Sequence, residues 1–169
     1  MDIIKIIKEE AYNYNEWKRK YNKWKRQNVT LRGIKELGKP NEVYGSFGKG
    51  LYTVPLSNKA MAKQYGDVHF VVNAIPQKPK IVYSLNEAEL LRQKLIEDFC
   101  KKNGKSYSLS FFEQNTSMEE EMKKLGYDGL IIKGREMVNY TPDEDNIQYF
   151  SDENQLMNHY KIYEENENT

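Results

Sequence analysis

Three short stretches of this 169-residue sequence carry residue types that could do chemistry. Arg32 precedes Gly33 at the end of an apolar segment, and its guanidinium has a fork geometry that suits phosphate oxygens. A glycine-rich run, 45–50, leads to Tyr52, and Glu136 follows another apolar segment. Taken singly, each has an ordinary structural explanation: a surface arginine, a tight turn and a hairpin carboxylate in water.

As an ordered set, the stretches resemble the ADP-ribosyltransferase superfamily. Gly48-Lys49-Gly50-Leu51-Tyr52 is similar to a Gly-Lys-Gly-Ile-Tyr segment of the poly(ADP-ribose) polymerase branch, and Glu136-Met137-Val138-Asn139-Tyr140 to that branch's Glu-x-x-x-Tyr strand. Tyr127-Asp128-Gly129-Leu130-Ile131 is similar to a lead-in of phage and bacterial relatives. Leu31-Arg32-Gly33 stands where the family has His-Gly or Arg-Gly. The resemblance covers about residues 29–150 and implies an α+β fold with a split β-sheet core.

The resemblance also implies a reaction, cleavage of the bond between nicotinamide and ribose in NAD. Glu136 would be catalytic, since a carboxylate stabilises the positive charge that develops on the sugar. Tyr52 would stack on one side of the nicotinamide ring and Tyr65 on the other. The backbone of Gly33 would hold the nicotinamide amide, and Arg32 would bind the adjoining ribose or the pyrophosphate.

The sequence mixes features of two branches of this family. The polymerase branch has His where this chain has Arg32, and the toxin branch has Ser where this chain has Tyr52, so Ser46 and Ser57 are alternative positions for such a serine. Gly134 stands where toxin relatives carry the Gln or Glu that selects the acceptor. We therefore expect transfer of a single ADP-ribose to a macromolecule whose identity the sequence does not give, with a protein acceptor favoured over a nucleic acid.

Apolar periodicity predicts the elements that position these residues. We expect an α+β chain with one domain over 1–169, divided into an N-terminal helix (1–28), an NAD-binding catalytic core (29–150) and a C-terminal helix with a frayed acidic tail (151–169). The predicted helices cover 2–27, 57–64, 84–103, 118–125 and 151–163, and the predicted strands cover 29–34, 51–54, 68–75, 80–83, 128–133, 136–140 and 147–150. Residues 38–50 are predicted to form a loop.

The first helix carries an apolar stripe at a spacing of three or four residues, formed by Ile3, Ile7, Tyr14, Trp17, Tyr21 and Trp24. We expect this stripe to pack on the rest of the domain. The other face is basic and could instead bind an acidic partner or nucleic acid.

Composition excludes several classes of protein. The formal charge is only +1, but residues 1–60 hold 13 basic and 6 acidic side chains and residues 61–169 hold 13 and 19. Hydrophobic residues make up 38%, and the 13 Tyr, 6 Phe and 2 Trp are too many for a disordered tail. No apolar run is long enough to span a membrane, and the start lacks the order of a signal peptide. One cysteine and two histidines leave no disulfide and no cysteine-based zinc site.

We therefore expect a metal-free, monomeric, cytoplasmic protein of a bacterium or a phage-infected cell, with NAD as co-substrate and no membrane partner. Lys49, in the basic part of the chain, would lie near a phosphate of NAD. Two alternatives remain open. The same site could act as an NAD glycohydrolase with water as the acceptor, or the chain could be a non-catalytic protein that binds nucleic acid or a partner through its basic helix.

Overall fold

The computed structural model describes residues 3–35 and 43–167, with side chains for 14–35 and 45–160. The fold is α+β, as predicted, with six α-helices and two sheets among these residues. The elements in chain order are α1 (Ile3–Arg26), β1 (Val29–Ile34), β2 (Val43–Gly45), β3 (Gly48–Thr53), the 3-10 turn η1 (Leu56–Asn58), α2 (Lys59–Lys63), β4 (Asp67–Val72), β5 (Pro79–Val82), α3 (Leu85–Lys102), α4 (Leu109–Asn115), α5 (Met118–Lys124), β6 (Gly129–Ile132), β7 (Glu136–Asn139), β8 (Gln148–Phe150) and α6 (Glu153–Glu167). No helix in the described part of the chain has the length and apolar character needed to cross a membrane.

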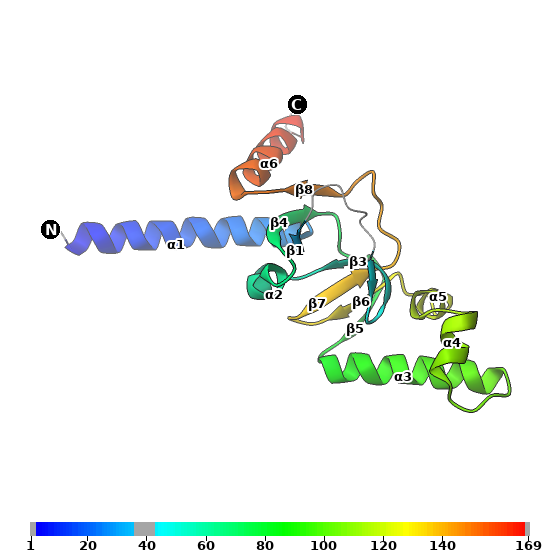
Figure 1. Ribbon diagram of the computed structural model, residues 1–169. Coiled ribbons are helices and arrows are strands. Elements are labelled where there is room, and N and C mark those ends of the chain that lie inside the picture. Colours follow the sequence, from blue (N-terminus) through cyan, green and yellow to red (C-terminus); the bar gives the residue numbers. More distant parts are fainter. Residues whose placement is uncertain (1–2, 36–42, 168–169) are drawn as a thin grey trace.

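The smaller sheet is antiparallel, in the order β1-β4-β8. Its outer face packs on the end of α1 and on α6, around Trp24, Val29, Val72, Leu156 and Tyr160. The larger sheet has the order β2-β3-β7-β6-β5, in which the short β2 pairs with β3 and is an edge strand among the described residues. Its one parallel pair, β5–β6, is connected through the helical segment α3–α5, because parallel neighbours need a long crossover. Figure 1 shows α3, α4 and α5 grouped at one end of the molecule, with α1 and α6 at the other.

Among the described residues, one isolated backbone bridge connects the two sheets. Leu31 of β1 and Val54, just after β3, exchange both backbone hydrogen bonds at 2.8 Å. Their side chains are buried together with Ala62 of α2. This bridge fixes how the face of one sheet continues into the face of the other.

The predicted loop over 38–50 is wrong in its second half. Residues 43–45 and 48–53 form the β2–β3 hairpin, while 36–42 lie outside the described residues. The glycines do mark a turn, since Gly48 has φ +107°, but they also allow close packing: a Cβ on Gly50 would lie 2.4 Å from the carbonyl oxygen of Asn139. Helix α6 continues to Glu167, beyond the end near Tyr163 that the sequence predicts.

The first helix differs more strongly from expectation. Trp24 is buried against the small sheet, but Tyr14 is 60% exposed and Trp17 is 55% exposed. Figure 1 shows α1 projecting away from the rest of the chain. The prediction that the whole stripe packs on the domain is therefore wrong for Tyr14 and Trp17, and the side chains of Ile3 and Ile7 lie outside the described ones.

Candidate active site

Strand register places three of the predicted site residues on one face. Tyr52 lies opposite Val138, and Glu136 is two residues from Val138 in β7, so all three side chains point to the same side of the sheet. On β1, Gly33 is two residues from Leu31, so both lie on the same face. Leu31 is bridged to Val54, which is two residues from Tyr52, so this face continues into the face of Tyr52. We call this continuous surface, which carries Gly33, Tyr52 and Glu136, the shared face.

Arg32 lies on the opposite face, because neighbours in a strand point in opposite directions. Its guanidinium donates a hydrogen bond to the hydroxyl of Tyr149 on β8 at 3.0 Å. Tyr149 in turn packs beside Leu51, Val71 and Ile147, the core between the two sheets. The structure therefore does not bring the Arg32 side chain to Tyr52 and Glu136.

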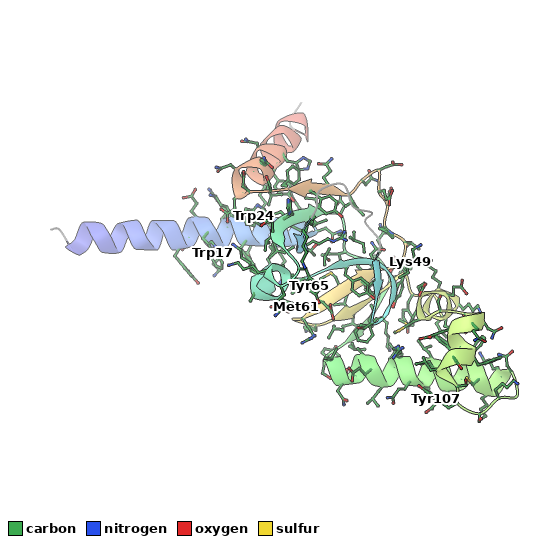
Figure 2. All side chains as sticks on the ribbon, in the orientation of Figure 1. Trp17, Trp24, Lys49, Met61, Tyr65 and Tyr107 are labelled. Atoms are coloured by element: carbon green, nitrogen blue, oxygen red, sulfur yellow. The ribbon has the colours of Figure 1, made fainter. Side chains whose placement is uncertain are left out.

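Lys49 also lies away from Glu136. It belongs to the hairpin end of β3, on the face opposite to Tyr52. Glu136 begins β7 at the other end of the pairing, in which Thr53 meets Met137. The separation along the strands is about five residues, or roughly 17 Å at 3.3–3.4 Å per residue. Figure 2 likewise shows Lys49 and Tyr65 at different ends of the sheet.

The carboxylate of Glu136 is largely buried, with 17% of the side chain exposed. Burial raises its pKa above the usual value for glutamate, since desolvation disfavours the charged form, and the positive charge of Arg135 partly opposes this rise. The guanidinium of Arg135 is 3.9 Å from the carboxylate, at the limit of an ion pair. Perturbed carboxylates of this kind are enriched at functional sites, although structural ones exist as well.

The phenol of Tyr52 is anchored in the β2–β3 turn. Its hydroxyl accepts a hydrogen bond from the amide of Phe47 at 3.1 Å and donates one to the carbonyl of Gly48 at 2.5 Å. The ring lies over Gly45, where a Cβ would come within 2.3 Å of it. Burial, with a further contribution from the charges of Glu136 and Glu119, raises the Tyr52 pKa far above neutrality. Tyr52 therefore stays protonated and offers a fixed aromatic ring rather than a proton.

The α2 segment connects Gly33 to the turn that carries Glu136. A Cβ on Gly33 would lie 1.9 Å from the carbonyl oxygen of Ala62, so α2 packs directly against this glycine. At the other end of α2, the amide of Asn58 donates to the carbonyls of Arg135 at 3.1 Å and Gly134 at 3.5 Å. The segment thus spans the shared face from β1 to the start of β7.

Tyr65 follows α2 and is 56% exposed. Figure 2 shows Tyr65 and Met61 together on this segment. Ser57 is exposed beside Asn58, while Ser46 is exposed in the β2–β3 turn, the end of β3 far from Glu136. Of the two alternative serines, only Ser57 lies on the segment that contacts the Glu136 turn.

Sequence reasoning missed Asn58 and Tyr149. Asn58 precedes a short helix, a position typical of a helix cap, which would have been the only signal for it. Tyr149 lies in the last strand and is found only through its contact with Arg32. No cluster of three or more His, Cys, Asp or Glu side chains suited to a metal ion occurs among the residues described. Comparisons with protein-family models, with curated proteins and with solved structures gave no match to this chain.

Proposed function

We propose that the chain is an NAD-dependent mono-ADP-ribosyltransferase with an ADP-ribosyltransferase-like split sheet. The observation that carries the proposal is the largely buried Glu136 on the face it shares with Tyr52 and Gly33, with its turn held by Asn58. The sequence resemblance names Glu136, Tyr52 and Gly33. The geometry adds that they belong to one surface of two joined sheets.

The chemistry proposed for this face is charge stabilisation. Breaking the nicotinamide–ribose bond leaves positive charge on the sugar, and an ionised Glu136 beside it lowers the energy of that state. The low solvent exposure of Glu136 strengthens the attraction, because less water screens it. The rings of Tyr52 and Tyr65 would orient the nicotinamide, which is flat and aromatic.

Arg32 has a different part in this proposal. Its side chain faces away from Glu136, so we do not expect it to touch the reacting ribose. On that face its guanidinium, which donates to Tyr149, would bind phosphate oxygens of the pyrophosphate, which match the guanidinium fork.

Hydrolysis of NAD by the same site is the second candidate. Residue 134, where relatives orient the acceptor, is an exposed glycine with φ +77° and no atom within 4 Å of a Cβ built there. A site without an acceptor-orienting side chain at this position leaves room for water.

The test is incubation with NAD labelled in the adenylate part, together with candidate acceptor proteins. We expect release of nicotinamide that falls by a factor of about 10²–10³ in Glu136→Gln, as for loss of a group that stabilises charge in the transition state. Glu97→Gln, at an exposed position of α3, is the matched control and should react like the unaltered chain. Label on protein identifies transfer, and free ADP-ribose alone identifies hydrolysis. No release of nicotinamide by the unaltered chain contradicts both.

A further inference from the structure

The exposed part of α1 carries a row of stacked aromatic rings. Trp17 stacks with Tyr14 at a centroid distance of 6.3 Å and with Tyr21 at 5.3 Å, with interplanar angles of 29° and 16°. We call these three residues the aromatic seam. Trp24, next in the series, is buried in the small sheet and donates to the sulfur of Met157, so it anchors the helix. Figure 2 shows Trp17 on the projecting part of α1 and Trp24 at its junction with the sheet.

The spacing of the seam is that of a helix that packs along another helix. Positions 14, 17, 21 and 24 alternate steps of three and four residues, and the sequence extends this series back to Ile3 and Ile7, with Glu10 as its one polar member. This 3.5-residue repeat places one line of side chains against a partner helix. Tryptophan and tyrosine are the side chains that most often anchor protein interfaces.

The seam is bordered by lysines on both sides. Lys18 and Lys25 each follow a Trp of the series, and Lys20 precedes Tyr21, which are the flanking positions that face a partner's charges in a helix pair. Lys20 has an ion pair with Glu16 at 3.7 Å, which is half-exposed and therefore weak. With Arg19, Lys23 and Arg26 also on this stretch, positive charge dominates it.

Two other occupants fit these observations less well. A second copy of the chain would bring Lys against Lys at the flanking positions in either orientation, which is repulsive. Nucleobases bind by stacking on the faces of aromatic rings, and the Trp17 ring is already stacked with Tyr14 and Tyr21 along the helix. A helix that lies along the seam contacts the outward edges of the rings instead.

We propose that α1 is a docking arm for an acidic amphipathic helix of another protein. The apolar side of that helix covers Tyr14, Trp17 and Tyr21, and its carboxylates pair with Lys18, Lys20 and Lys25. This function is separate from NAD chemistry, because Trp17 lies on the part of α1 that projects away from both sheets (Figure 2).

The probe is a fluorescein-labelled synthetic peptide of three heptads with Leu at the apolar positions and Glu at the flanking positions. A peptide with Lys in place of Glu, and a 20-residue oligothymidylate, are run in parallel by fluorescence anisotropy on the full chain without NAD. We expect binding of the acidic peptide, weakened at least tenfold by Trp17→Ala. Tyr107→Ala, which removes a similarly exposed ring elsewhere, should leave the affinity unchanged.

Reversing the charge of the α1 lysines should create binding to the lysine peptide, which a misfolded variant would not show. The triple variant Lys18→Glu, Lys20→Glu, Lys25→Glu should lose the acidic peptide and bind the lysine peptide. The same exchange at the exposed Lys101, Lys102 and Lys123 should change neither affinity. Circular dichroism checks that each variant keeps its helix content.

Three outcomes overturn the proposal. They are acidic-peptide binding that is absent or insensitive to Trp17→Ala, an oligothymidylate bound more tightly than the peptide through the α1 lysines, and a sedimenting dimer that Trp17→Ala dissociates. None of these results bears on whether Glu136 acts on NAD, so the two proposals fail separately.

Discussion

The side-chain amide of Asn58 donates a hydrogen bond of 3.1 Å to the backbone carbonyl of Arg135, 77 positions away in the chain. Asparagine at this place before a helix usually caps it, yet Asn58 makes no side-chain cap hydrogen bond to α2. The amide donates to the Gly134 and Arg135 carbonyls in the turn that precedes Glu136, and at 3.6 Å to the sulfur of Met61. Asn58 is therefore a positioning residue for the carboxylate rather than a part of the helix start.

Replacing Asn58 by Asp tests this role while preserving its size. A carboxylate cannot donate to the carbonyls of Gly134 and Arg135, so the turn should loosen and Glu136 should lose its fixed orientation. We expect kcat for NAD cleavage to fall about tenfold, with a smaller change in KM, as for a misplaced catalytic group. Lys59→Gln, at the exposed neighbour that follows Asn58, is the control. A lower melting temperature with unchanged kcat would show that Asn58 only stabilises the fold.

Glu136→Gln should raise stability while it removes activity. The folded-state pKa of Glu136 is raised by burial, so the folded chain binds more protons than the unfolded chain between the two pKa values. Stability from this group therefore falls as pH rises through that window, and the loss persists at higher pH. Glutamine carries no charge and avoids it. We expect a melting temperature a few degrees higher at pH 7, with the difference shrinking toward acidic pH. A variant that is less stable than the unaltered chain at pH 7 would contradict this expectation.

The acidic limb of the pH–rate profile should depend on Arg135. Its positive charge lowers the pKa of Glu136 against the effect of burial. Arg135→Gln should therefore raise that pKa and move the acidic limb of kcat/KM to higher pH, because catalysis needs the ionised carboxylate. Lys133→Gln removes a nearby charge that has no ion pair with Glu136, and its profile should stay in place. An unshifted profile in Arg135→Gln would mean that another group sets the limb.

Local patterns predicted most elements but not how they pair. Helix α3 begins as the sequence indicates, with Ser84 accepting from the amide of Glu87. The hairpin β2–β3 was hidden because its glycines resemble a loop, whereas they are needed for contacts with residues far along the chain, such as Gly50 against Asn139. Helix α4 was missed because it is short and lies among polar residues, although Ser108 caps it.

Periodicity alone also could not say what covers an apolar stripe. It identified the side of α1 that is apolar, but Trp24 is buried within the chain and Trp17 is not. For the site, the alternation of a strand already implies that Arg32 and Gly33 point in opposite directions. Which of the two residues lies on the Glu136 face depends on the bridge between Leu31 and Val54. These residues are 23 positions apart, so a local sequence pattern does not reveal the bridge.

Variants of Arg32 and Tyr149 can test whether Arg32 binds phosphate or only stabilises the fold. Burial raises the pKa of Tyr149, and the adjacent guanidinium opposes that rise. If NAD pyrophosphate replaces Tyr149 as the partner of Arg32, then Tyr149→Phe removes the competitor and KM for NAD should fall or stay constant. Arg32→Lys loses the fork and should raise KM several-fold with little change in kcat. Steady-state kinetics on both variants check this. If Tyr149→Phe and Arg32→Lys raise KM alike, the hydrogen bond between them serves the fold.

Gly33 has a packing reason to be glycine that is independent of any ligand. A Cβ there would lie 1.9 Å from the carbonyl oxygen of Ala62, and backbone cannot move aside as a flexible side chain can. Gly33→Ala should therefore push α2 away from β1 and destabilise the chain by about 1–3 kcal/mol, the usual cost of overpacking. Urea unfolding measures this change in the free energy of unfolding.

Because the α2 segment also carries Asn58, the shift caused by Gly33→Ala should loosen the Glu136 turn, so kcat should fall together with stability. Gly104→Ala is the control for kcat: alanine at its φ of +68° is strained and should cost stability, but the space around it is open and α2 is untouched, so kcat should not change. If Gly33→Ala keeps full stability and only KM for NAD rises, the glycine is there for the close approach of a ligand, as the sequence resemblance implies, and α2 does not depend on it.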